Sequence, residues 1–249
     1  MPPILHIMRH GQGYHSHDVT KDGHLLHDPS LTEKGKQQCI DRCKDFDRHD
    51  KIELLLASPL RRAIQTCQLA FAPCVERGLV IIALPTAEEV SDAPSDTGSP
   101  VEDLIKEFGD EKVDFDHLKH GWYKHEGEFA TDAKACNARA LKLRKWIQAR
   151  PEKEVALVSH GFFNHFTTGE VDDEGEQTTP WWNEAELRTY QFRDGDDEAA
   201  MIYETDESLA KRGMHLQGGA DRGEVKVNQP SRRGTLPNLS FQNQEEGSS

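Results

Sequence analysis

The feature of this chain that most constrains its fold is the alternation of short apolar runs with helical patterns. Each run spans a few residues and is bounded by polar or glycine residues, which indicates a buried strand. The strands predicted in the first two thirds of the chain cover residues 4–8, 52–57, 79–84 and 154–159. Helices are predicted over residues 32–47 (with Thr32 as N-cap), 59–71, 101–108 and 131–149. Strands that alternate with helices imply an α/β fold, a three-layer sandwich in which a mostly parallel sheet carries helices on both faces.

The last predicted elements follow the fourth strand. A short helix is expected from Phe162 onward. Two further strands, over residues 187–192 and 199–203, are expected to be joined by a turn at Asp194-Gly195. These two strands would extend the same sheet.

The domain organisation follows from where periodicity is lost. Residues 91–100 are expected to form a loop, and residues 110–129 fit neither a helical nor a strand pattern. After about residue 209 the sequence becomes rich in Gly, Ser, Gln, Asn and Pro. We therefore expect one domain over residues 1–208 and an extended or disordered tail over residues 209–249.

The charge balance restricts the partners of the chain. Its 30 Lys and Arg against 44 Asp and Glu leave a net charge of −14. Nucleic-acid backbones need basic surfaces, so we expect no nucleic-acid partner. Any phosphate site must then be a local cationic pocket in an acidic protein.

Hydropathy and cysteine usage indicate a compartment. No run of about 18 apolar residues exists, and the chain begins a strand without a basic segment followed by an apolar one. We therefore expect no membrane span, no membrane partner and no secretory signal. The five cysteines are odd in number and form no Cys-x-x-Cys, which favours reduced thiols in a cytoplasmic protein. Cys39 and Cys43 lie one helical turn apart and could chelate a metal, but packing on a helix is the favoured interpretation.

Residues able to handle a phosphate gather where the predicted strands end. Arg9-His10-Gly11 follows the first strand, and Ser58–Ala63, with two arginines, follows the second. The third strand leads to Glu88-Glu89 and the fourth to Ser159-His160-Gly161. The ends of parallel strands meet at one edge of a sheet, where helix N-termini favour an anion. We expect two histidines, two or three arginines and a carboxylate to converge there.

Four stretches carry a family resemblance, and they occur in the family's order. They are Met8-Arg9-His10-Gly11-Gln12, Leu31–Gly35, Ser58–Thr66 and Val158-Ser159-His160-Gly161. Together they resemble the histidine phosphatase superfamily, also called phosphoglycerate-mutase-like, over residues 4–168. The loop Asp96-Thr97-Gly98-Ser99 further resembles a fungal phosphoglycerate-mutase-like phosphatase branch.

The resemblance implies a nucleophile and its phosphate ligands. His10 would attack the phosphorus and become phosphohistidine. Arg9, Arg62 and His160 would bind the phosphoryl oxygens, with His160 also counted among the catalytic residues. Arg62 matches and Arg61 does not, because the family's arginine directly precedes the alanine.

The resemblance also implies a proton donor, together with one departure from the family. The donor follows the third strand, which points to Glu89, with Glu88 as the fallback. Gln12 and Ser16 are the remaining candidate phosphate ligands. The family has an asparagine shortly after the nucleophile where this chain has Ser16, and a hydroxyl offers fewer hydrogen bonds than an amide.

The expected reaction is metal-independent hydrolysis of a small-molecule phosphomonoester. Arginines and a protonated histidine can neutralise the phosphoryl oxygens, and a carboxylic acid can protonate the leaving group and later activate water. We therefore expect no cofactor. The sequence carries no indication of an oligomeric state.

Three other interpretations stay open. A phosphoglycerate-type mutase would use the same residues but shield the phosphohistidine from water, and the short 85–130 region favours hydrolysis over this. A non-catalytic protein could bind phosphorylated ligands with the same groups. His15-Ser16-His17-Asp18 resembles part of a metal site, but the further ligands lack recognisable spacing.

Two aromatic segments have open roles. His117, His120 and His125, with Trp122 and Tyr123, could line the substrate side of the pocket or form an exposed polar insertion. Trp181-Trp182 could cap the pocket or pack at the edge of the domain.

Overall fold

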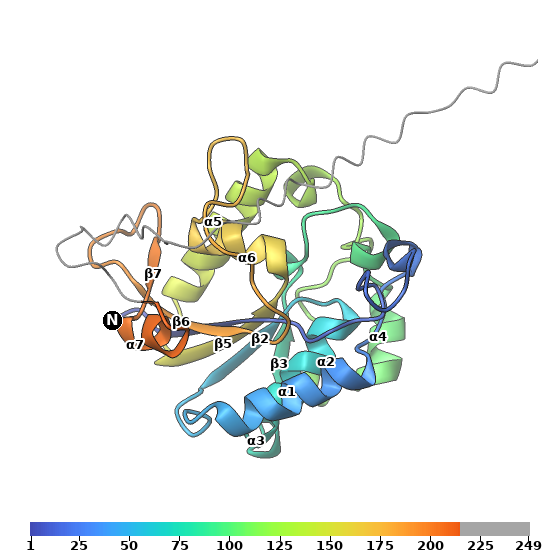
Figure 1. The fold of residues 1–249 in the computed structure, drawn as a ribbon, viewed down its shortest axis with the longest axis horizontal. Helices are drawn as coiled ribbons and strands as arrows, with labels where there is room; N and C mark the ends of the chain where they lie inside the picture. Colours follow the sequence, from blue (N-terminus) through green and yellow to red (C-terminus); the bar gives the residue numbers. More distant parts are fainter. Residues whose placement is uncertain (215–249) are drawn as a thin grey trace, which may run out of the picture.

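A computed structural model describes residues 1–214 and shows one seven-stranded sheet in the order β4-β3-β2-β5-β1-β6-β7 (Figure 1). Five neighbouring strands pair in parallel, from β4 to β1 in that order, while β6 pairs antiparallel with β1 and with β7. The expected α/β class and mostly parallel sheet are confirmed. The strands are β1 Ile4–Arg9, β2 Leu54–Ala57, β3 Ile81–Ala83, β4 Val113–Asp114, β5 Glu154–Ser159, β6 Leu187–Phe192 and β7 Ile202–Glu204.

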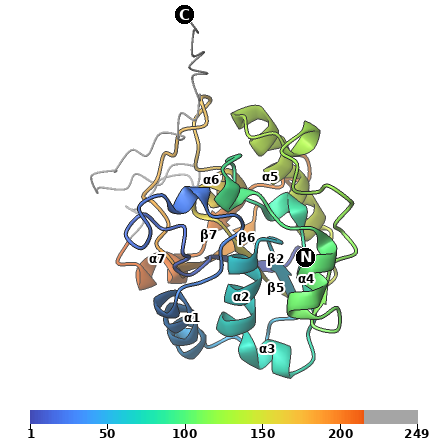
Figure 2. The same ribbon diagram turned by 90° about the vertical axis from the view of Figure 1, so that its right-hand side faces the viewer.

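Helices cover both faces of the sheet, as expected for a three-layer sandwich (Figures 1 and 2). One face is packed by α1 Glu33–Asp45, α2 Arg61–Ala70, α3 Ala72–Glu76 and α4 Val101–Phe108. The other is packed by α5 Ala133–Gln148 and α6 Gly161–Thr168. Successive strand side chains point to opposite faces, so Leu5 and Ile7 join the α5–α6 core while Met8 joins the α1–α4 core. Both faces are therefore apolar and both are buried.

The structure confirms that the last two predicted strands pair, and it corrects where the second one begins. β6 and β7 pair antiparallel, with Phe192 opposite Ile202, and Asp194-Gly195 lies in a turn as predicted. β7 begins at Ile202 and not at residue 199, so residues 193–201 connect the two strands. Ala200 has a positive φ of 48°, and the Arg144 guanidinium donates to the carbonyls of Ala199 and Ala200 at 3.1 Å each.

Three further helices and strands within residues 1–214 were not predicted, and helix α3, which follows the predicted helix 59–71, is one of them. β4 is two residues long and lies within the segment 110–129, where Val113 is its buried residue. Helix α7, Asp206–Lys211, begins after Thr205, whose hydroxyl accepts from the Ser208 N–H at 3.2 Å. α7 crosses the expected domain boundary between residues 208 and 209, and most of the expected tail lies outside the described residues.

The short 3₁₀ turns position loops around the sheet. They are Gly23–Leu25 (η1), Pro85–Ala87 (η2), Pro94–Asp96 (η3) and Gly127–Phe129 (η4). None of the helices within residues 1–214 combines the length and the hydropathy of a membrane span. All five cysteines lie in this part of the chain and are free thiols.

Candidate active site

The parallel register of the sheet brings three polar strand ends together. Arg9 of β1 pairs with Ser159 of β5, and Ala57 of β2 pairs with Val158. The residues that come next in the chain are therefore side by side at the carboxyl edge. They are His10, Ser58 and His160.

His10 is buried, with 2% of its surface exposed, and its ring has one unprotonated nitrogen. Nδ1 lies 2.7 Å from the Gly11 carbonyl oxygen, which can only accept, so Nδ1 carries the proton. Nε2 is left with its lone pair and receives the Nε–H of Arg62 at 3.2 Å. Burial and then the charge of Arg62 hold the pKa of His10 well below its usual value. The ring is thus a neutral imidazole that can act as a nucleophile through Nε2.

The turn after His10 requires glycine because helix α1 approaches it closely. A Cβ on Gly11 would lie 2.6 Å from the Gly35 carbonyl oxygen, and a Cβ on Gly35 would lie 2.0 Å from that of Gln12. Thr32 caps α1 by accepting from the Gly35 N–H at 2.9 Å, and its own N–H donates to the Gln12 carbonyl at 2.9 Å. The Leu31–Gly35 stretch therefore anchors the backbone that carries the nucleophile.

Arg62, at the start of α2, is the central cation of the site. Only 1% of its surface is exposed, and its guanidinium reaches both histidines, with Nη2 lying 3.2 Å from His160 Nδ1. Nη1 donates to the Ser95 carbonyl at 2.6 Å, and Nη2 donates to Asp96 Oδ1 at 2.7 Å.

Arg61, the adjacent arginine, turns away from the site. Its backbone and guanidinium bind the Asp28 carboxylate at 2.9 Å and 3.0 Å, and its Nε donates to Glu107 at 2.6 Å. The structure therefore places Arg62 in the site, and not Arg61.

His160 completes a pair of imidazoles. Its ring is fully buried, and its centroid lies 5.1 Å from that of His10. A guanidinium only donates, so Nδ1 accepts from Arg62 and Nε2–H donates to Ser58 Oγ at 2.7 Å. Burial and the charge of Arg62 lower the pKa of His160 well below its usual value. A bound phosphoryl dianion would oppose both arginine charges and favour the protonated ring.

Arg9 is the last residue of β1 and directly precedes His10. Its Nη1 donates to the Trp182 carbonyl, while its Nε has no partner among the described residues. Burial lowers the pKa of Arg9, and the carboxylates of Glu184 and Glu89 oppose that shift. Trp181, 39% exposed, lies at the rim with its ring 5.9 Å from the guanidinium. Trp182 is fully buried and stacks on Tyr190, so it packs in the core and does not cap the site.

The two candidate acids point in different directions. Glu89 accepts from the Phe163 and Phe162 N–H groups of α6 at 2.9 Å and 3.3 Å, and the charge of Arg62 acts on it. Burial and then the neighbouring Asp96 raise the pKa of Glu89. Glu88 is fully buried on the far side, where it accepts from Arg139 at 2.9 Å. Burial raises the pKa of Glu88 to about 8.

The chain matches the family model of the histidine phosphatase superfamily (branch 1) over residues 5–204. It belongs to that superfamily. A probable phosphatase of Schizosaccharomyces pombe is 32% identical over 160 residues, covering 63% of this chain and 73% of the relative. A phosphoglycerate mutase-like protein of Arabidopsis thaliana is 30% identical over 198 residues, covering 65% and 72%.

Solved structures of histidine phosphatases share the fold. The mycobacterial glucosyl-3-phosphoglycerate phosphatase matches with a TM-score of 0.52 at 18% identity, covering 82% of this chain and 97% of the other. The protein YhfR of Bacillus stearothermophilus matches with a TM-score of 0.54 at 15% identity, covering 82% and 95%.

Two of the expected phosphate ligands of this member of the superfamily are hydrogen-bonded to other side chains. Gln12 donates its amide to Asp18 at 3.0 Å and accepts from the Thr32 hydroxyl at 2.9 Å. Ser16 donates its hydroxyl to Glu184 at 3.1 Å. Their role as phosphate ligands stays a prediction.

Sequence reasoning missed several residues of the histidine phosphatase site. Asp96 was noted only within its loop, and Ser58 only within its motif, yet they bind Arg62 and His160. His15 was considered as a metal ligand, but its ring centroid lies 5.3 Å from that of His10. Within residues 1–214 no group of three or more His, Cys, Asp or Glu side chains is arranged to hold a metal ion.

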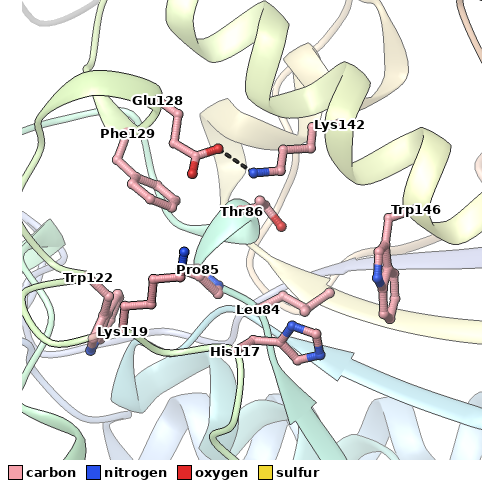
Figure 3. Close-up of a pocket in the computed structure, with 10 residues that line it drawn as sticks. All are labelled: Leu84, Pro85, Thr86, His117, Lys119, Trp122, Glu128, Phe129, Lys142 and Trp146. Atoms are coloured by element: carbon pink, nitrogen blue, oxygen red, sulfur yellow. Dashed lines mark hydrogen bonds and ion pairs between the residues drawn. The ribbon is translucent and has the colours of Figure 1, made fainter.

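A cavity of about 220 Å³ lies between the segment 117–129 and α5 (Figure 3). Turn η2, which leads into Glu88 and Glu89, forms part of its wall. Of the five aromatic residues expected to line the substrate side, His117 and Trp122 are found here. The remaining side chains that characterise it are Lys119, Phe129, Trp146 and the Glu128–Lys142 ion pair.

Proposed function

We propose that this histidine phosphatase hydrolyses small-molecule phosphomonoesters through a phosphohistidine on His10. The observation that carries the proposal is the unprotonated Nε2 of a neutral His10, which accepts from the Arg62 guanidinium in the absence of a phosphoryl group and lies beside the His160 ring. A nucleophile needs this lone pair, and a phosphoryl group needs cations at its equatorial oxygens.

The first step forms the bond from His10 Nε2 to phosphorus while the bond from phosphorus to the ester oxygen breaks. Arg9 and Arg62 bind the phosphoryl oxygens, and His160 joins them once the dianion favours its protonation. Glu89 gives its proton to the leaving oxygen. The raised pKa of Glu89, caused by burial and Asp96, supports the protonated form that this step requires.

The second step returns the enzyme to its starting state. The Glu89 carboxylate, now ionised, accepts a proton from a water molecule whose oxygen attacks phosphorus, and the bond to His10 breaks. Inorganic phosphate leaves. The charge is neutralised by arginine and histidine side chains, so we propose that no metal is required.

Hydrolysis is supported over isomerisation by one of the two relatives. The fission-yeast relative, the more similar of the two, is named a probable phosphatase, while the Arabidopsis relative is named phosphoglycerate mutase-like. We also propose a cytoplasmic location, supported by the five free thiols.

The test is release of inorganic phosphate from an aryl phosphate, with and without a chelator. We expect equal rates in both, and no detectable turnover by His10→Ala. Loss of activity on chelation would contradict the metal-free mechanism, and turnover by His10→Ala would contradict the nucleophile. Isomerisation of a phosphoglycerate without phosphate release would identify a mutase, and phosphate-ligand binding without turnover would identify a binding protein.

A further inference from the structure

His15 is a half-buried, polar side chain beside the site that the mechanism above leaves without a role. It lies five residues after His10, in a turn closed by the Ser16 N–H donating to the Gly13 carbonyl at 3.0 Å. Its ring centroid is 5.3 Å from that of His10, with the planes inclined at 57°. It is therefore placed against the nucleophile.

Two glycines fix this placement. A Cβ on Gly13 would lie 2.5 Å from His15 Nδ1, so any other residue there would displace the ring. A Cβ on Gly23 would lie 2.5 Å from the His15 carbonyl oxygen, so the backbone of the turn is held from the other side. Close approaches of this kind determine both where the residue sits and where its ring points.

The charges of the site act directly on this ring. Burial and then the charges of Arg62 and Arg9 lower the pKa of His15 to about 2. His15 is near enough to His10 and His160 for a charge on its ring to disfavour their protonated forms. It thus lies beside all four residues proposed to handle the phosphoryl group, and its low pKa keeps it neutral.

The ring has an unused donor. Within residues 1–214 the His15 side chain makes no hydrogen bond, and Nδ1 is buried. A buried N–H without a partner is rarer than an unpaired acceptor, so the proton is assigned to Nε2. Nε2–H is then free to donate to a bound group.

The neighbouring Ser16 does not supply the amide donor that the family's asparagine would provide. Its hydroxyl donates to Glu184, whose second oxygen accepts from the Gln38 amide at 3.0 Å. The chain has therefore lost an amide at one position and has a neutral imidazole N–H at the adjacent one.

We propose that His15 is a phosphoryl-binding residue of this site and donates Nε2–H to a phosphoryl oxygen. The assignment rests on the proposed function and deepens it. A neutral donor satisfies an oxygen of the dianion without adding a further positive charge beside two arginines, and it acts throughout the pH range in which His10 is a nucleophile.

The experiment compares His15→Leu, which keeps an apolar side chain of similar size without a donor, with His15→Asn, which keeps a donor. His17→Ala is the matched control, since His17 is an exposed histidine of the same segment. The readouts are kcat/KM for an aryl phosphate and competitive inhibition by inorganic phosphate. Melting temperatures verify that each variant folds.

We expect His15→Leu to lower kcat/KM by about 10- to 100-fold and to weaken phosphate inhibition about tenfold. His15→Asn should retain most of both, and His17→Ala should match the wild type. A His15→Leu variant within twofold of the wild type in both readouts would overturn the proposal, as would equal losses in the Leu and Asn variants.

Two further results keep the outcome unambiguous. If His15→Leu fails to fold, the wild type is titrated with inorganic phosphate. The ¹⁵N–¹H signal of His15 Nε2 should shift on binding, and an unshifted signal overturns the proposal.

Turnover by His10→Ala would refute the proposed function itself. An inactive His10→Ala beside an unimpaired His15→Leu would refute only the role of His15.

Discussion

The carboxyl edge of the sheet and the cavity of Figure 3 are built in different ways. At the edge, His10, Arg62 and His160 each follow a strand directly or open the next helix, and the register of the sheet sets their separation. In the cavity, Lys119 comes from a long connection and Lys142 from the exposed side of α5. The edge can therefore hold the geometry of a reaction, whereas the cavity is open to variation in shape.

The difference also concerns charge. At the edge the cations are buried and bound to named partners, so each replacement leaves a desolvated group behind. In the cavity both members of the Glu128–Lys142 pair are more than half exposed, so water replaces what is removed. Substitutions at the edge should lower kcat. Substitutions in the cavity should leave kcat unchanged and alter only how well larger substrates bind.

The largest contrast is expected from the arginine pair. Arg62→Ala removes a cation bound to both histidines and should lower kcat/KM by about 10³-fold. Arg61→Ala should leave kcat within about threefold but lower the free energy of unfolding by about 2 kcal/mol, because Asp28 stays buried without its cation. Steady-state kinetics and chemical denaturation measure the two effects. Equal losses of activity would remove the distinction between these neighbours.

The next contrast is between the two glutamates. Glu89→Gln should lower kcat/KM about 10²-fold for an alkyl phosphate and less for an aryl phosphate, whose leaving oxygen needs no proton. Glu88→Gln should retain turnover within about fivefold, since Glu88 faces Arg139 and not the site. A larger loss in Glu88→Gln would exchange the two assignments.

The pH profile provides a second readout of this contrast. Activity requires neutral His10, whose pKa is lowered, and protonated Glu89, whose pKa is raised. The activity of the wild type should therefore fall at acidic pH, where His10 becomes protonated, and this fall should lie well below the ordinary histidine pKa of 6.5. Activity should also fall at basic pH, where Glu89 ionises, and this fall should lie above the ordinary glutamate pKa of 4.5. Glu89→Gln should lose the basic flank and Glu88→Gln should keep it. A basic flank that persists in Glu89→Gln would assign it to another group.

These contrasts also show what the sequence could predict. The gathering of His10, His160, two arginines and two glutamates was predicted from positions next to strand ends, whereas the choice of Arg62 and of Glu89 came from the family resemblance. The same local reasoning placed Thr32 correctly as a helix cap.

What the sequence missed depended on partners remote in sequence. Ser16 and Gln12 were expected at the phosphate, and the hydrogen bond of Ser16 to Glu184, 168 residues away in the chain, was not predicted. The second strand near the turn at residue 194 was predicted to begin at residue 199, but the carbonyls of Ala199 and Ala200 accept from Arg144 of another helix and β7 begins at Ile202. A buried polar side chain forms a hydrogen bond with a partner that the fold places beside it. The spacing of residues along the chain does not reveal such a partner when it is remote in sequence.

The smallest effect is expected in the cavity. Lys119→Ala should leave kcat/KM for a small aryl phosphate within about twofold, as for most exposed substitutions. Lys145→Ala, an exposed lysine of α5 outside the cavity, is the control. Kinetics with a small and a bulky phosphomonoester measure both. A tenfold loss with the small substrate would show that the cavity takes part in the reaction at the edge.

The most direct test of the central claim is to trap the phosphorylated enzyme. Glu89→Gln, given an aryl phosphate labelled at phosphorus, should form the phosphoenzyme rapidly and hydrolyse it slowly, because the leaving group needs no acid while the water lacks its base. We predict about one acid-labile, base-stable phosphoryl group per chain, on His10, and none in Glu89→Gln combined with His10→Ala. Turnover without any label on His10, or label that survives in the double variant, would contradict the account.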